Sequence, residues 1–288
     1  MGEKYNIAVV GATGNVGREM TSILEQRDFP IDDLYVLASS RSKGKKINFR
    51  DEDLIVEDLA EFDFSKVHIG LFSPGGTVSA EFAPKAAAAG CITSNAGNAL
   101  FGYLSGAPNN NPINEDKKTR NDFAASNTMI DHMTATADPR MSIYYAASAA
   151  DGIFVGEVYG LDETNAALTP DDAVSQRGGA VLAADFPGIF MDAAQVNFLL
   201  AEGAARGWSM GGTDADFFTA ANAASMEFWG VDQADADTYA AANTYDAATW
   251  KTSIGTSKWV ALYMQGQEGW AEVRRLDAPT LNACADGQ

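Results

Sequence analysis

The chain has 288 residues, with 20 Lys and Arg against 39 Asp and Glu, so its formal net charge is −19. This length favours two domains at roughly 100–200 residues per domain, and the charge would repel nucleic acid and anionic membrane surfaces. A hydrophobic fraction of 46% and a charged fraction of 20% are typical of a globular chain and exclude disorder as its main state.

The start of the chain does not resemble an export signal, because residues 1–6 lead at once into a short apolar run and then a glycine. No segment has the ~20 consecutive apolar residues needed to span a bilayer. Cys91 and Cys284 lie far apart and form neither a disulfide framework nor a zinc motif. We therefore expect no membrane insertion and a cytoplasmic location.

The first 97 residues alternate between strand and helix signals. Apolar runs at 5–10, 34–37 and 67–72 predict strands, and helical spacing over 15–26 and 79–89 predicts helices. This alternation is typical of βαβ units and therefore of a parallel sheet.

A glycine-rich motif follows the first strand and opens the first helix, with the sequence Gly11-Ala12-Thr13-Gly14-Asn15-Val16-Gly17. Glycines allow a tight turn and close backbone approach, and the free N–H groups of a helix start attract a pyrophosphate. The alternative is a strand-to-helix turn in which the glycines serve steric needs only.

The end of the second strand favours NADP over NAD. An NAD site usually has an acid here for the ribose hydroxyls, whereas this chain reads Ala38-Ser39-Ser40-Arg41-Ser42-Lys43. Serines and an arginine suit a 2′-phosphate, although Arg41 and Lys43 would also suit a solvated basic loop. The loop after the third strand, Ser73-Pro74-Gly75-Gly76-Thr77, either closes over the phosphates or is a simple turn.

Further motifs in this part are Arg27-Asp28-Phe29-Pro30, Ser42-x-Gly44-Lys45, Phe62-Asp63-Phe64, Gly75-Gly76-x-Val78-Ser79 and Ala88-Ala89-Gly90-Cys91. With these motifs, residues 1 to about 92 resemble the N-terminal part of aspartate-semialdehyde dehydrogenase. The resemblance implies an NADP-binding domain. Together with the loops described above, it predicts cofactor contacts from Gly11, Thr13, Gly14, Asn15, Val16, Gly17, Ser39, Arg41, Ser42, Ser73, Gly75 and Gly76.

The catalytic residues of that family have no recognisable counterpart. The family uses a cysteine thioester and a histidine acid/base from a later domain. After residue 97 the only cysteine is Cys284 and the only histidine is His132, and neither stands in the family's motif. Cys91 fits a buried structural thiol and His68 a packed ring. We expect negligible dehydrogenase activity and assign no catalytic residue and no metal site.

The composition changes near residue 97. Residues 1–97 hold 10 basic and 14 acidic residues, a net charge of −4, which leaves −15 for the rest of the chain. Turn formers such as Pro108-Asn109-Asn110-Asn111-Pro112 then interrupt the pattern, which predicts a linker over 98–120.

Helical spacing dominates beyond residue 121. It predicts a helix over about 189–206, another opened by the capping box Thr213-x-x-Asp216, and apolar stripes from residue 250 to Pro279. Short strands are expected at 142–146 and 153–158.

Several blocks in this part occur in a recognisable order: Asp138-Pro139-Arg140, Gly156-x-x-Tyr159-Gly160, Gln195-x-x-Phe198-Leu199-Leu200-Ala201-Glu202, Arg206-Gly207-Trp208, residues 224–230, Lys258-Trp259-x-Ala261-Leu262 and residues 266–275. With these blocks, residues 126–282 resemble the C-terminal portion of SusD/RagB-type outer-membrane glycan-binding proteins. The resemblance implies helix-rich, tetratricopeptide-like packing, an outer-membrane location and oligosaccharide capture beside a TonB-dependent transporter.

Tryptophans and charged residues in this part have two interpretations each. Five tryptophans either belong to the core or stack on sugars: Trp208, Trp229, Trp250, Trp259 and Trp270. Five charged residues either form internal ion pairs or serve a site: Glu202, Glu268, Glu272, Arg274 and Arg275.

We interpret the chain as a chimeric composite. We expect an α/β Rossmann-like NADP-binding domain over 1–97, a linker over 98–120 and a mainly α SusD/RagB-like domain over 121–288. One hypothesis is nucleotide binding without turnover, and the other is a carbohydrate-binding module. A third is that neither part folds well enough to act.

Overall fold

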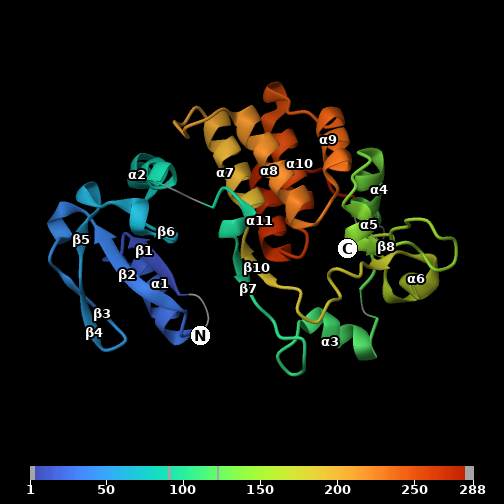
Figure 1. The fold of residues 1–288 in the computed structure, drawn as a ribbon, viewed down its shortest axis with the longest axis horizontal. Coiled ribbons are helices and arrows are strands. Elements are labelled where there is room, and N and C mark those ends of the chain that lie inside the picture. The colour runs from blue at the N-terminus through green and yellow to red at the C-terminus, as the bar shows by residue number, and fades with distance from the viewer. Residues whose placement is uncertain (1–3, 90–91, 122, 283–288) are drawn as a thin grey trace. The chain divides into compact units, whose positions relative to one another are not determined.

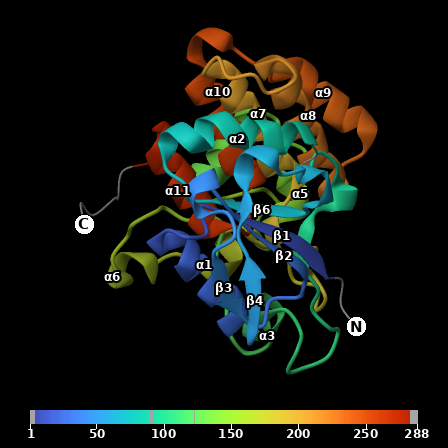
Figure 2. The same ribbon diagram turned by 90° about the vertical axis from the view of Figure 1, so that its left-hand side faces the viewer.

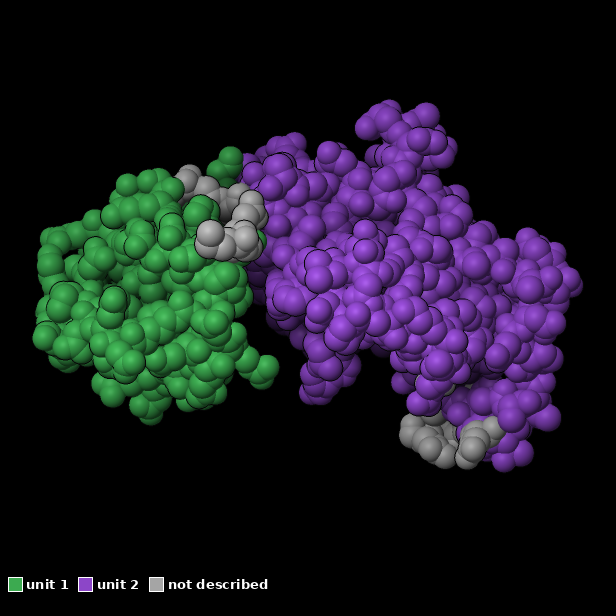
Figure 3. All heavy atoms as spheres, turned by 60° about the horizontal axis from the view of Figure 1, so that its bottom comes forward, with its two compact units in different colours: residues 1–91, 208–211 green, residues 92–207, 212–288 purple. Residues whose placement is uncertain are grey.

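The structure is a computed structural model that describes residues 4–89, 92–121 and 123–282. It divides into two compact units (Figure 3). Unit 1 comprises residues 1–91 and 208–211, and unit 2 comprises residues 92–207 and 212–288.

Unit 1 is built on a four-stranded sheet with the strand order β5-β2-β1-β6 and parallel pairing throughout. Its strands are β1 (Tyr5–Val10), β2 (Ile31–Ala38), β5 (Glu57–Asp58) and β6 (Ile69–Phe72). Helix α1 (Asn15–Gln26) follows β1, helix α2 (Gly76–Ala89) follows β6, and β3 (Lys46–Phe49) pairs with β4 (Glu52–Ile55) in a hairpin. The predicted parallel α/β arrangement is confirmed.

The central strand β1 is buried on both faces. Ile7 and Val9 pack in a cluster that includes residues of α1, whereas Ala8 and Val10 pack in a second cluster with residues of α2. Figure 2 shows β1 and β2 with α1 and α2 on either side. A strand covered on both faces loses the polar alternation of a half-exposed strand, which explains the uninterrupted apolar run.

The predicted boundaries in unit 1 agree closely with the structure. The strand at 5–10 and the helix at 15–26 match β1 and α1. The run at 34–37 lies inside β2, and the third core strand begins at Ile69 rather than at residue 67. The β3–β4 hairpin was not predicted, because its strands have only four residues each and half of those residues are polar.

Unit 2 is mainly helical, as predicted (Figure 1). Its helices are α3 (Pro112–Thr119), α4 (Asn127–Ala135), α5 (Met141–Tyr144), α6 (Glu163–Ala166), α7 (Ala193–Ala205), α8 (Asp214–Phe228), α9 (Gln233–Ala242), α10 (Trp250–Ala261) and α11 (Gly266–Leu276). Two short antiparallel pairs accompany them: β7 (Ala99–Phe101) with β10 (Gly188–Met191), and β8 (Tyr145–Ala146) with β9 (Gln176–Arg177).

Alanines bring α7 and α8 close together. One buried cluster is formed largely by small side chains: Ala193, Ala194, Ala201, Ala221 and Ala224, with Phe198, Phe218, Ile254, Ala261 and Leu276. The predicted capping box is confirmed, because the Thr213 side chain accepts a hydrogen bond from the Asp216 N–H and caps α8. Leu199, an apolar residue of α7, is exposed.

Two short strands were predicted in the middle of unit 2, at 142–146 and 153–158. The structure has only part of the first strand and a single bridge in place of the second. Residues 141–144 form the helical turn α5, and only Tyr145–Ala146 is a strand. Residues 153–158 carry a single bridge between Ser126 and Glu157. A short apolar run is compatible with either a strand or a buried helical turn, so tertiary contacts decide its conformation.

The segment expected to be a linker, 98–120, is part of unit 2. Strand β7 pairs with β10, and Asn111 caps α3 by accepting a hydrogen bond from the Ile113 N–H. The Asn111 amide also donates to the Phe186 carbonyl, and the Asn114 amide donates to the Leu182 carbonyl. The asparagines that suggested a flexible loop are therefore used in long-range hydrogen bonds.

A buried ion pair joins three elements of unit 2. The Arg140 guanidinium donates to both oxygens of Asp138, at 2.9 Å from Nε and 2.5 Å from Nη2. Its Nη1 donates to the Ser225 hydroxyl of α8 at 2.7 Å, and the Tyr239 ring of α9 lies 5.6 Å from the guanidinium carbon. Both charged side chains are fully buried, so each depends on the other to compensate its charge.

We expect Asp138→Asn to destabilise unit 2 by about 3–5 kcal/mol, because it leaves the Arg140 charge buried without its counter-ion. Urea unfolding followed by tryptophan fluorescence measures this, since four of the five tryptophans lie in unit 2. Asp235→Asn, at an exposed position on α9, is the matched control and should change stability by less than about 0.5 kcal/mol. Equal stability of the two variants would contradict the assignment.

Candidate functional site

The glycine-rich loop leaves β1 in a conformation that requires its first glycine. Gly11 has φ +86°, and a Cβ there would lie 2.9 Å from the Ser73 carbonyl carbon and from the Pro74 nitrogen. The Gly11 and Ala12 N–H groups donate to the Leu37 carbonyl at the end of β2. The loop is therefore held between the ends of β2 and β6.

The other two glycines let α1 begin close to the strand. A Cβ on Gly17 would lie 2.3 Å from the Gly11 carbonyl oxygen, so only glycine fits there. A Cβ on Gly14 would lie 3.3 Å from the same oxygen. The sequence prediction of close backbone approach is thus met by the geometry of the loop.

The start of α1 is open to an anion. Gly14 is the N-cap, it supplies no side-chain cap, and the first turn contains no acidic residue. Within the described residues, the N–H groups of Asn15, Val16 and Gly17 have no hydrogen-bond partner. Because these amides lie at the positive end of the helix dipole, they offer donors to a phosphate.

The residues predicted to bind the 2′-phosphate lie at the end of β2, but they differ in exposure to solvent. Ser39 and Arg41 are exposed, and Arg41 has no ion-pair partner among residues 4–89, 92–121 and 123–282. Ser42 is buried, and its hydroxyl accepts a hydrogen bond from the Lys45 ammonium at 3.4 Å. Ser42 therefore shapes the turn, whereas Ser39 and Arg41 are free to contact a ligand.

The loop after β6 reaches the same edge of the sheet. The Ser73 N–H and hydroxyl both donate to the Val10 carbonyl, at 2.8 Å and 3.2 Å. Gly75 has φ +90°, and a Cβ at Gly75 or Gly76 would meet no atom within 4 Å. The structure thus brings the three predicted loops together where parallel strands end, which is where open α/β sheets bind ligands.

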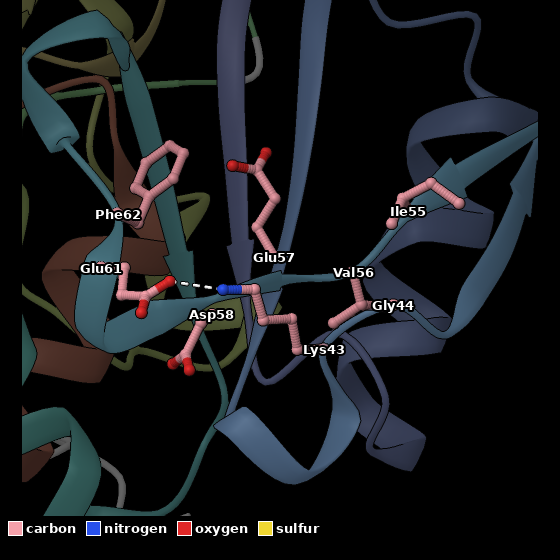
Figure 4. Close-up of a pocket in the computed structure, with 8 residues that line it drawn as sticks. All are labelled: Lys43, Gly44, Ile55, Val56, Glu57, Asp58, Glu61 and Phe62. Atoms are coloured by element: carbon pink, nitrogen blue, oxygen red, sulfur yellow. Dashed lines mark hydrogen bonds and ion pairs between the residues drawn. The ribbon is translucent and has the colours of Figure 1, made fainter.

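Unit 1 contains a cavity of about 350 Å³ to which no residue of the glycine-rich loop contributes. Figure 4 shows the residues that line it. Its lining consists of Lys43, Gly44, Ile55, Val56, Glu57, Asp58, Glu61 and Phe62. The Lys43 ammonium pairs with Glu61 at 2.5 Å, so the lining presents carboxylates without a free cation. Carboxylates repel a phosphate, so the open edge of the sheet is the better anion site.

Two family models match the chain. One, SusD-like and described as starch-binding associating with outer membrane, matches residues 70–288, which is well over half of the sequence. The chain belongs to this SusD-like family. The other, described as a semialdehyde dehydrogenase NAD binding domain, matches residues 6–101 and supports a nicotinamide cofactor. Both predicted resemblances are confirmed, and the SusD-like match extends N-terminally over the segment expected to be a linker.

Individual relatives also fall into two groups, the aspartate-semialdehyde dehydrogenases and the SusD homologues. An aspartate-semialdehyde dehydrogenase from Legionella pneumophila is 62% identical over 92 residues, covering 32% of this chain and 26% of the relative. A chitin-binding SusD homologue from Flavobacterium johnsoniae has 27% identity and a TM-score of 0.63, over 72% of this chain and 48% of that chain. A SusD homologue from Bacteroides thetaiotaomicron has 26% identity and a TM-score of 0.62, over 74% and 49%. The chain spans about a quarter of the length of the curated relatives and about half that of these SusD homologues.

His68 was expected to be a packed ring but is exposed, and neither cysteine can be placed. His68 Nδ1 accepts a hydrogen bond from the Asn6 N–H at 2.8 Å. His132 packs edge-on against Trp259, and burial lowers its pKa. Cys91 and Cys284 lie outside the described residues. Across the described ranges, no group of His, Cys, Asp and Glu could hold a metal ion, and no helix is long and apolar enough to cross a membrane.

The tryptophans of the SusD-like part divide between core and surface. Trp229 is buried, and Trp250 and Trp259 pack against buried clusters. Trp208 and Trp270 are more than half exposed, at 53% and 61%. Trp229, Trp250 and Trp259 therefore belong to the core, whereas Trp208 and Trp270 do not.

The predicted ion pairs link α7, α10 and α11 of the SusD-like part. Arg275 pairs with both Glu202 and Glu272, and Glu202 also accepts from Arg206 Nε at 2.8 Å. The buried Lys258 ammonium lies 3.1 Å from Glu272. Two of the five charged residues considered in the sequence form no such ion pair among the described residues. Arg274 stacks on Trp270 at 4.8 Å, and Glu268 accepts a hydrogen bond from Gln195.

Glu202 makes the stability of unit 2 depend on pH. Burial alone would raise its pKa, but hydrogen bonds from Arg275 and Arg206 outweigh burial and hold the pKa below its ordinary value of 4.5. The stabilisation is therefore complete above that value and is lost as the pH falls through the lowered pKa of the folded state.

We expect Glu202→Gln to destabilise unit 2 near neutral pH and to cost progressively less in acid. Urea unfolding of wild type and variant at a series of pH values measures this difference. The matched variant Glu268→Gln, whose carboxylate contacts no cation among the described residues, should show no such trend. A Glu202→Gln penalty that stays constant down to strongly acid pH would contradict the linkage.

Proposed function

We propose that unit 1 binds NADP(H) at the edge formed by the glycine-rich loop, the end of β2 and the loop after β6. The observation that carries this proposal is the free set of amides at Asn15, Val16 and Gly17, beside a loop whose glycines allow a ligand to approach the backbone. The pyrophosphate would bind these amides. Ser73, Gly75 and Gly76 would border it from the neighbouring loop.

The preference for the phosphorylated dinucleotide rests on Arg41. Its guanidinium is exposed, without an ion-pair partner among the described residues, and follows β2 directly. Residues 38–43 contain no acid to accept hydrogen bonds from a ribose 2′-hydroxyl. A free cation at this position favours a 2′-phosphate through charge-assisted hydrogen bonds, with Ser39 as a second donor.

The proposed binding is without turnover. The chain holds Cys91, Cys284, His68 and His132 as its only cysteines and histidines. A thioester mechanism needs a thiolate and an acid/base that reach the same substrate atom. Within unit 1, His68 Nδ1 already accepts a hydrogen bond from the Asn6 N–H at the start of β1, and His132 packs against Trp259 within unit 2, so we assign neither ring an acid/base role.

Calorimetric titration of NADPH and NADH tests the proposal. Arg41→Ala should cost on the order of 1–3 kcal/mol in NADPH binding and leave NADH nearly unchanged, because it removes the partner of the 2′-phosphate. Gly14→Val should abolish binding of both nucleotides by filling the space where the phosphates approach. Lys46→Ala, which removes an equal charge from the hairpin where Lys46 pairs with Asp53, is the control.

Two results would overturn parts of this assignment. Equal affinity of the wild type for NADH and NADPH would refute the role of Arg41. Failure of the wild type to bind either nucleotide would refute the dinucleotide site itself.

A second function, oligosaccharide binding by unit 2, is favoured by a different observation. The SusD-like match covers this unit, and one of its structural relatives is described as a chitin-binding SusD homologue. The same proposal includes tetratricopeptide-like packing of the α7–α8 and α10–α11 helix pairs, an outer-membrane setting and a TonB-dependent transporter as partner. Binding of malto-oligosaccharide or chito-oligosaccharide by the whole chain would support it, and binding of neither would contradict it.

A further inference from the structure

A second cavity, of about 420 Å³, lies in unit 2 between helix α4 and the segment 154–156. Its lining residues are Ile130, Asp131, Thr134, Ala135, Phe154, Val155 and Gly156. This volume lies within the range of roughly 300–1,000 Å³ that is usual for small-molecule sites. Gly156, the first residue of the Gly156-x-x-Tyr159-Gly160 motif found in the sequence, forms part of its wall.

Backbone hydrogen bonds fix the wall of this cavity on both sides. The Val155 N–H donates to the Ser175 hydroxyl, and its carbonyl accepts from the Ser175 N–H at 2.7 Å. The Glu157 N–H donates to the Ala125 carbonyl, and its carbonyl accepts from the Asn127 N–H. A segment held in this way presents a preformed surface to a ligand.

Gly156 allows the wall to lie against the start of α4. A Cβ at this position would lie 2.3 Å from Asn127 Cα and 2.4 Å from Asn127 N, so no other residue fits. The neighbouring Tyr159 N–H donates to Asn127 Oδ1 at 3.2 Å, and the Tyr159 side chain is 57% exposed. The residues of the motif therefore have distinct structural roles. Gly156 allows the segment to contact the start of α4, and Tyr159 places an aromatic ring at the surface.

The lining combines an aromatic and aliphatic surface with acceptors. Phe154 and Ile130 supply apolar area, while Asp131 and Thr134 supply a carboxylate and a hydroxyl. The Asp131 carboxylate has no hydrogen bond or ion pair with any residue that the structure describes. Among the described residues, the Thr134 hydroxyl donates only to the weak acceptor Met141 Sδ, at 3.8 Å.

This combination matches a neutral sugar. A pyranose has an apolar C–H face that packs on aromatic rings and hydroxyls that donate to a carboxylate. An anionic ligand is disfavoured, because the cavity offers a carboxylate without a cation.

We propose that the α4 cavity, defined by the seven lining residues above, holds one sugar ring of a neutral oligosaccharide. The ring packs on Phe154, its hydroxyls donate to Asp131 and pair with Thr134, and the exposed Tyr159 offers an aromatic face to a further sugar. This inference rests on the proposed carbohydrate-binding function and names the site that performs it.

Titration of the whole chain with malto-oligosaccharide and with chito-oligosaccharide tests the site. Ala135→Trp should abolish binding, because position 135 is exposed and the indole fills the cavity. Asp131→Asn should weaken binding about tenfold, because it removes a charged acceptor. Ala240→Trp and Asp235→Asn, at exposed positions on α9, are matched controls and should bind as the wild type does.

The outcomes separate the site from the function. If the wild type binds neither oligosaccharide, the carbohydrate function and the site fail together. If the wild type binds but Ala135→Trp and Asp131→Asn bind equally well, the cavity assignment is overturned while the function stands. Urea unfolding midpoints show whether the Ala135→Trp variant is folded. If that variant is unfolded, binding by Asp131→Asn decides, and unchanged affinity of Asp131→Asn overturns the cavity assignment.

Discussion

Burial of apolar side chains in four clusters, each formed within one unit, is the constraint on which the structure depends. Two clusters cover opposite faces of the unit 1 sheet, so β1 and the loop that follows it are fixed by packing on both sides. The other two lie around α7 and α8 and around Tyr144 and Trp229 in unit 2. Because each unit fills its own core, the glycine-rich loop and the α4 cavity are each supported locally.

The dinucleotide site was predictable because its determinants are local. A β-rich run, three glycines at fixed spacing and a helical repeat follow one another within residues 5–26, and the structure reproduces both element boundaries. The convergence with Ser39, Arg41 and Ser73 follows from parallel pairing, which places the carboxyl ends of β1, β2 and β6 at one edge. Only the buried position of Ser42 depends on a contact, with Lys45, that spacing does not show.

Much of unit 2 was not predictable, because long-range polar contacts decide its local structure. The 98–120 segment has the composition of a flexible loop, yet Asn111 and Asn114 bond carbonyls about 70 residues away. Arg140 precedes α5 and bonds Ser225, 85 residues later, so an apolar run expected to be a strand begins as a helical turn. The α4 cavity joins residues 130–135 to 154–156 through bonds to Ala125, Asn127 and Ser175, and only the glycine and tyrosine of its motif are visible in the sequence.

One glycine at each of the two sites is required for the same steric reason. Gly17 and Gly156 each occupy a position where a Cβ would lie 2.3 Å from a backbone atom. In both places glycine lets a loop lie against the start of a helix, and that contact shapes the surface offered to a ligand. The two sites therefore share a construction principle, although one suits a phosphate and the other a neutral ring.

The central claim is that two self-contained cores carry two separate sites. Calorimetric melting of the whole chain, with and without saturating NADPH and with tryptophan fluorescence recorded in parallel, tests it most directly. Residues 1–91 contain no tryptophan, so fluorescence follows mainly unit 2. We expect two transitions, and NADPH should raise the midpoint of only the one that fluorescence does not follow, since a ligand stabilises the unit that binds it. A single transition, seen equally by both methods and raised as a whole by NADPH, would contradict it.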